Sequence, residues 1–130
     1  MSETQVPSPP PKRLLILDDE PMMVRAIKRL MAGEYAMTSP GTPADAVAEV
    51  RGGARFDVIL CDLMMPFMSG IQFYDAIRAI DPEQARRIVF MTGGAYAPLV
   101  LEFLSSVANP RIDKPVGRLA LRAAIQAIGP

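Results

Sequence analysis

Short apolar runs alternate with longer segments of helical spacing along most of this chain. The apolar runs predict strands at residues 13–17, 35–38, 56–62, 87–92 and 111–113. After each run, apolar residues recur at helical spacing, which predicts helices at residues 21–32, 43–51, 71–80, 98–107 and 121–128. Strands that alternate with helices pack as a parallel sheet with right-handed crossovers. The pattern therefore predicts one α/β domain, a doubly wound sheet of five parallel strands with helices on both faces.

The first residues of the chain do not share this pattern. Residues 1–12 are rich in proline and carry no periodic apolar positions, which is typical of a flexible, extended linker. Residues 13–130 are expected to form the folded domain. Because proline-rich segments often connect domains, residues 1–12 are interpreted as a linker between two domains of a longer protein.

Composition excludes several classes of function. Lysine and arginine number 14, as do aspartate and glutamate, so no net charge favours nucleic acid or an anionic membrane surface. No apolar run is long enough to span a bilayer, and no apolar leader marks the N-terminus, so a cytoplasmic location is expected. The single cysteine, Cys61, lies inside an apolar run and is expected in the core of a protein from a reducing compartment. The chain has no histidine, so any chemistry falls to carboxylates.

Polar side chains follow four of the five predicted strands. Asp18 and Asp19 follow the first strand, Asp62 ends the third, Thr92 ends the fourth and Lys114 follows the fifth. Parallel strands bring their carboxyl ends to one edge of a sheet, so these side chains are expected to converge. Three close carboxylates favour a hard cation such as Mg²⁺, and an ammonium group with a hydroxyl beside them suits phosphoryl transfer.

Each of these residues also has an ordinary structural interpretation. Asp18, Asp19 and Asp62 could cap a helix or a turn, Thr92 could be a turn hydroxyl, and Lys114 could be a solvated surface charge. The specificity comes from their combination at four strand ends.

From about residue 13 to its end, the chain resembles the receiver domain of two-component response regulators. The matching segments are residues 15–21, residues 62–66 with Gly70, residues 91–93 and residues 113–115. The resemblance implies the flavodoxin-like strand order 2-1-3-4-5. It also implies that Asp62 accepts a phosphoryl group from a phosphohistidine on a histidine kinase or a histidine phosphotransfer protein.

The resemblance further assigns roles around the acceptor. It implies that Asp19, Asp62 and the Met64 carbonyl bind Mg²⁺ directly and that Asp18 acts through water. It implies that Lys114 and the Thr92 hydroxyl contact the phosphoryl group, and that the peptide bond from Lys114 to Pro115 is cis. As such a domain, the chain is expected to be no enzyme but a phosphoacceptor that signals by a conformational shift.

Two positions depart from the family pattern. The position three residues before the lysine is usually aromatic and takes part in the conformational switch, but here it is Arg111. Tyr96 is a candidate substitute. The residue after the Lys-Pro pair is commonly phenylalanine but here is Val116, which affects packing more than chemistry.

Alternatives to the phosphoacceptor remain. Arg111 supports a pseudo-receiver, which would act as a protein-interaction module without phosphorylation. An aspartyl-phosphate phosphatase would need a second aspartate two positions after Asp62, where Met64 stands. A flavin carrier is disfavoured because the acidic segment 18–20 repels a phosphate. The phosphoacceptor could be a single-domain response regulator or the C-terminal receiver of a hybrid sensor histidine kinase.

The resemblance implies that two further positions affect how long the phosphorylated form lasts. Met64 and Gly94 stand where receivers with polar side chains can orient an attacking water, and neither offers a polar group. We therefore expect slow self-dephosphorylation, which loss of label from the purified phosphoprotein measures. Decay within seconds would contradict the expectation.

Overall fold

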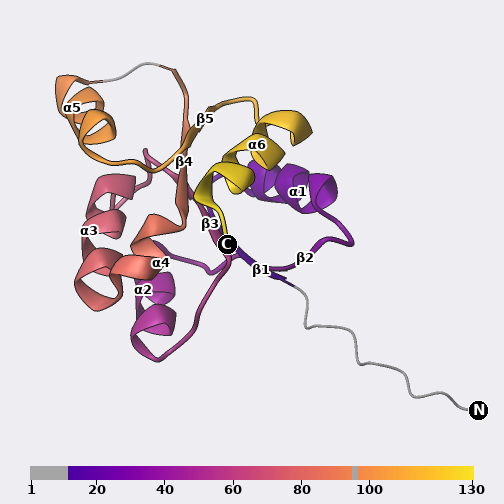
Figure 1. The fold of residues 1–130 in the computed structure, drawn as a ribbon, viewed down its shortest axis with the longest axis horizontal. Coiled ribbons are helices and arrows are strands. Elements are labelled where there is room, and N and C mark those ends of the chain that lie inside the picture. The colour runs from indigo at the N-terminus through magenta and orange to yellow at the C-terminus, as the bar shows by residue number, and fades with distance from the viewer. Residues whose placement is uncertain (1–11, 95–96) are drawn as a thin grey trace, which may run out of the picture.

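One parallel sheet forms the centre of the molecule (Figure 1), in a computed structural model that describes residues 12–94 and 97–130. Its strands are β1 (Lys12–Leu17), β2 (Tyr35–Thr38), β3 (Val58–Asp62), β4 (Ile88–Thr92) and β5 (Arg111–Asp113). All pairs are parallel and their order is β2-β1-β3-β4-β5. The predicted flavodoxin-like topology is confirmed. Lys12 begins β1, and the rest of the predicted linker, like Tyr96, lies outside the described residues.

Six helices accompany the sheet in the described part of the chain. They are α1 (Pro21–Leu30), α2 (Pro43–Arg51), α3 (Gly70–Ile80), α4 (Pro82–Arg86), α5 (Pro98–Ser106) and α6 (Arg118–Ile128). The short helix α4 was not predicted. Asp81 ends α3, and its side chain accepts a hydrogen bond from the Glu83 N–H, which starts a new helix at Pro82. Five residues are too few to show helical periodicity, so the Asp-Pro pair indicated only a stop.

The helices lie on both faces of the sheet (Figure 1). α1 and α6 cover one face, and α2, α3 and α5 lie on the other. Neighbouring strand residues alternate between the two layers: Ile59 and Cys61 pack with one set of helices, while Val58 and Leu60 pack with the other. Every residue of β3 and of β4 is buried. The apolar runs are therefore continuous because the central strands are covered on both sides.

A buried glutamine explains why β3 begins two residues later than predicted. Gln84 on α4 is only 3 % exposed, and its Oε1 accepts a hydrogen bond from the Phe56 N–H at 2.8 Å. Its Nε2 donates to the Phe56 carbonyl at 3.1 Å. The side chain thus takes both backbone groups that a neighbouring strand would otherwise use.

None of the described helices has the length and hydropathy needed to cross a membrane.

Substitution of Gln84 tests this side-chain contact. Gln84→Ala leaves a buried N–H and C=O without partners, which should lower the free energy of unfolding by about 2–4 kcal/mol. Denaturant titration measures the loss. Gln126→Ala on the exposed face of α6 is the matched control, with an expected change within about 0.5 kcal/mol. Equal effects of the two substitutions would show that the Phe56 contacts contribute nothing.

Candidate functional site

Three carboxylates meet at the carboxyl edge of the sheet. Leu17 of β1 pairs in register with Cys61 of β3, so the residues that follow, Asp18 and Asp62, lie side by side. Asp19 adds a third group, and one carboxylate oxygen of each residue lies within 4.8 Å of those of the other two. The predicted convergence of Asp18, Asp19 and Asp62 is therefore present in the structure.

The ammonium group of Lys114 lies between two of these carboxylates. Its Nζ is 3.1 Å from Asp62 Oδ2 and 3.1 Å from Asp18 Oδ2, while Glu20 Oε1 is farther away at 3.9 Å. The Asp18 and Asp62 side chains are almost fully buried, and that of Lys114 is 18 % exposed. Water screens this pair of contacts little, so the lysine holds the ends of β1 and β3 together.

Burial and these contacts act in opposite directions on the titration of the site. Burial raises the pKa of the Asp62 carboxyl above its usual value, and hydrogen bonds from the Met64 N–H and from Lys114 partly offset this. Burial alone would lower the pKa of Lys114, but its contacts with the Asp18 and Asp62 carboxylates outweigh that effect and raise it. Lys114 is therefore charged at neutral pH.

The carboxylate cluster fits a divalent cation. Asp18 Oδ1 accepts a hydrogen bond from the Glu20 N–H at 2.9 Å. Asp18 Oδ2 is buried beside Lys114 but forms no hydrogen bond with any residue that the structure describes. A buried carboxylate oxygen with an open lone pair, in a cluster of oxygen ligands, suits a hard cation such as Mg²⁺.

The hydroxyl group of Thr92 forms a hydrogen bond outside the carboxylate cluster. Thr92 ends β4 and is only 2 % exposed, but its Oγ1 donates a hydrogen bond to Asp113 Oδ1 at 2.8 Å. The Lys114 N–H donates to the Thr92 carbonyl at 2.7 Å, and the peptide bond from Lys114 to Pro115 is cis, as expected. Thr92 thus lies at the edge of the site, and its hydroxyl is bound to Asp113, for which the sequence pattern predicted no role.

The absence of a side chain at Gly70 allows the start of α3 to pack closely against the end of β3. A Cβ atom on Gly70 would lie 2.8 Å from the Asp62 carbonyl oxygen and 2.8 Å from the Leu63 Cα. The N–H of Gly70 donates to the Leu63 carbonyl at 2.9 Å. Only glycine fits this close contact, which fixes the loop after Asp62.

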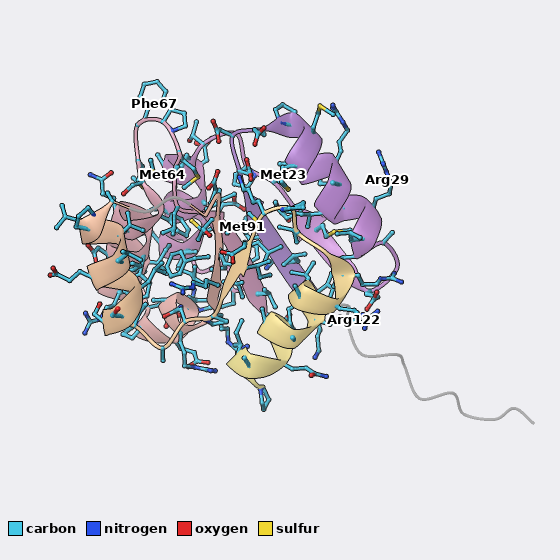
Figure 2. All side chains as sticks on the ribbon, turned by 90° about the horizontal axis from the view of Figure 1, so that it is seen from above. Met23, Arg29, Met64, Phe67, Met91 and Arg122 are labelled. Atoms are coloured by element: carbon cyan, nitrogen blue, oxygen red, sulfur yellow. The ribbon has the colours of Figure 1, made fainter. Side chains whose placement is uncertain are left out.

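The same loop carries an exposed aromatic residue and borders a pocket. Phe67 has a φ of 69°, is fully exposed and points away from the rest of the molecule at the loop tip (Figure 2). A pocket of about 430 Å³ lies between residues 40–44 and 65–68, with Asp18 and Asp19 in its wall. The sequence pattern gave no sign of this pocket, because its walls come from separate loops.

Position 111, which is usually aromatic in receiver domains, holds an exposed arginine in this chain. Arg111 begins β5 at the edge of the sheet. Three aromatic rings instead connect α3, β4 and α5: Phe103 lies 5.3 Å from both Tyr74 and Phe90, ring centroid to ring centroid. This cluster is the main aromatic contact of α5, a helix that has no buried residue.

Comparisons with known proteins agree with this fold. The chain belongs to the response regulator receiver domain family, whose model matches residues 14–126. It is 34% identical over 121 residues to protein-glutamate methylesterase/protein-glutamine glutaminase 1 of Bordetella avium, with 89% of the chain and 34% of that protein covered. It is 31% identical over 118 residues to the transcriptional regulatory protein BtsR of Salmonella typhi, with 82% of the chain and 47% of that protein covered. The chain thus spans less than half the length of these relatives.

A solved receiver domain shows the same architecture. The receiver domain of sensor histidine kinase PA1611 from Pseudomonas aeruginosa PAO1 superposes with a TM-score of 0.77 at 26% identity, covering 93% of this chain and 100% of that one. That structure has a magnesium ion coordinated in its active site cleft. In this chain, Asp18, Asp19 and Asp62 form a carboxylate cluster whose geometry could hold a metal ion.

Removal of one charge should make the metal-free domain more stable. Because the pKa of Asp62 is raised in the folded protein, ionisation of this carboxyl destabilises the folded state at pH values above its folded-state pKa. This destabilisation decreases as the pH falls through that pKa. Asp62→Asn should therefore raise the thermal midpoint in EDTA at pH 7, and the difference from the unchanged protein should shrink on acidification. Midpoints measured between pH 7 and pH 4 check this. A lower midpoint for the variant at pH 7 would show that the contact with Lys114 outweighs burial.

Proposed function

We propose that this chain is the phosphoacceptor of a two-component phosphorelay, with Asp62 as the acceptor. The observation that supports this most directly is the placement of Asp62: a buried carboxylate 3.1 Å from the Lys114 ammonium, beside Asp18 and Asp19. The donor is a phosphohistidine on a histidine kinase or a histidine phosphotransfer protein, since the chain itself has no histidine. An Asp62 oxygen forms the new P–O bond, the P–N bond breaks, and a proton goes to the leaving imidazole nitrogen.

The surrounding residues have distinct roles in this proposal. Lys114 balances the charge of the phosphoryl oxygens, and the Thr92 hydroxyl turns toward one of them after transfer. Asp19, Asp62 and the Met64 carbonyl would hold Mg²⁺ directly, with Asp18 acting through water. When bound, this ion would supply the positive charge that offsets the crowded carboxylates and the incoming phosphoryl group.

The chain works as a signalling domain rather than as an enzyme in this proposal. Phosphorylation adds roughly two negative charges to the site and shifts the balance between two states of the face around α5. The relatives carry such a domain within longer proteins, and the proline-rich leader favours the C-terminal receiver of a hybrid histidine kinase over a single-domain regulator. The balanced charge supports a protein partner rather than nucleic acid or a membrane, and the buried free thiol of Cys61 is compatible with the cytoplasm.

A pseudo-receiver is the second candidate. It is favoured by Arg111, because the position that commonly couples phosphorylation to the output surface has no aromatic ring. In that case the domain would bind its partner without a phosphoryl group on Asp62.

Phosphorylation by a small donor separates the two candidates. The unchanged protein, incubated with acetyl phosphate and Mg²⁺, should gain the mass of one phosphoryl group, and Asp62→Asn should gain none. Asp75→Asn on the exposed surface of α3 is the matched control and should react as the unchanged protein does. Label on the Asp62 variant would refute the assignment of the acceptor. If the unchanged protein gains no phosphoryl group either in Mg²⁺ or in EDTA, the result would favour the pseudo-receiver.

A further inference from the structure

The ends of β4 and β5 are joined by a side-chain hydrogen bond. Thr92 and Asp113 are the last residues of these strands and are partners in register. The buried Thr92 Oγ1 donates to Oδ1 of the exposed Asp113 at 2.8 Å. A hydrogen bond to a carboxylate is stronger than one between neutral groups. The contact therefore fixes the orientation of the Thr92 hydroxyl in the state that the structure shows.

This orientation conflicts with the role of Thr92 in the proposed function. A threonine hydroxyl has one proton and can donate one strong hydrogen bond at a time. While it donates to Asp113, it cannot donate to a phosphoryl oxygen on Asp62. The two acceptors thus compete for one donor, and each phosphorylation has to break the bond to Asp113.

We propose that Asp113 is a positioning residue that holds the Thr92 hydroxyl in the unphosphorylated state. The inference rests on the proposed function, because it concerns the competition between Asp113 and the phosphoryl group. Asp113 stabilises the resting arrangement and so lowers the affinity of the site for a phosphoryl group. The bond also connects β4 to the edge strand β5, so its loss on phosphorylation alters a contact on which the position of β5 depends.

The absence of an aromatic residue at position 111 makes this contact more important. An aromatic switch residue would report the movement of Thr92 from the start of β5, and Arg111 has no ring for that purpose. Asp113, two residues further along β5, contacts Thr92 directly. The link between hydroxyl movement and β5 is then polar instead of aromatic.

A mimic of the phosphoryl group measures the competition. Beryllofluoride with Mg²⁺ binds an acceptor carboxylate as a tetrahedral mimic, and calorimetric titration gives its affinity. Asp113→Ala should bind it about fivefold tighter than the unchanged protein, which corresponds to the loss of one hydrogen bond in the resting state. Asp113→Asn, which keeps an acceptor oxygen but no charge, should show a smaller gain in the same direction.

A double substitution separates the hydrogen bond from a general effect of charge. In a Thr92→Val background the hydroxyl is gone, so Asp113→Ala should no longer tighten binding. Asp75→Ala on α3 removes an exposed carboxylate away from the site and should leave the affinity unchanged. Equal affinities of the unchanged protein and Asp113→Ala, or a gain that persists with Thr92→Val, would overturn the role of Asp113. If the unchanged protein binds no beryllofluoride and takes no label from acetyl phosphate, the proposed function itself fails.

Discussion

The contact on which the site depends is the lysine ammonium between two buried carboxylates. Lys114 lies 3.1 Å from an oxygen of Asp18 and 3.1 Å from one of Asp62, and both carboxylates are shielded from water. Burial and the neighbouring Asp18 charge raise the pKa of Asp62, and the Lys114 ammonium acts in the opposite direction. This one side chain partly offsets the effect of burial on the pKa of Asp62, and it also connects the carboxyl ends of β1, β3 and β5. The crowding that remains around Asp19 suits the divalent cation that the proposed chemistry needs.

In the proposed function, acceptance of a phosphoryl group and transmission of the signal would depend on different parts of this sheet edge. The proposed acceptor, the lysine and the carboxylate cluster lie at the ends of β1, β3 and β5, whereas Thr92 and Asp113 lie at the ends of β4 and β5. α5 has no buried residue and packs on β4 through the ring of Phe103 against Phe90. A helix held by so few buried contacts can shift at low cost. If the proposed function holds, α5 and β5 are the elements expected to respond to phosphorylation.

Much of the fold was predictable from the chain, for a physical reason. The central strands β1, β3 and β4 are short and buried along most or all of their length, so each leaves a continuous apolar run, and the helices leave a 3.6-residue period. The predicted elements differ from the observed ones where a side chain forms hydrogen bonds with backbone groups. Gln84 takes the hydrogen bonds of Phe56 and delays β3, and the Asp81 cap starts the short helix α4 directly after α3. Neither contact leaves a periodic signal.

By itself, the sequence determined which side chains stand at the strand ends, and a parallel sheet then had to bring Asp18, Asp19, Asp62 and Lys114 together. Only the tertiary structure decided where the Thr92 hydroxyl points and that Asp113 accepts its hydrogen bond. It also decided the close approach at Gly70 and the pocket beside Asp18. Strand ends follow from local patterns, because periodicity reports burial. Hydroxyl orientation and the packing of separate loops depend on atoms distant in the chain, which local patterns do not contain.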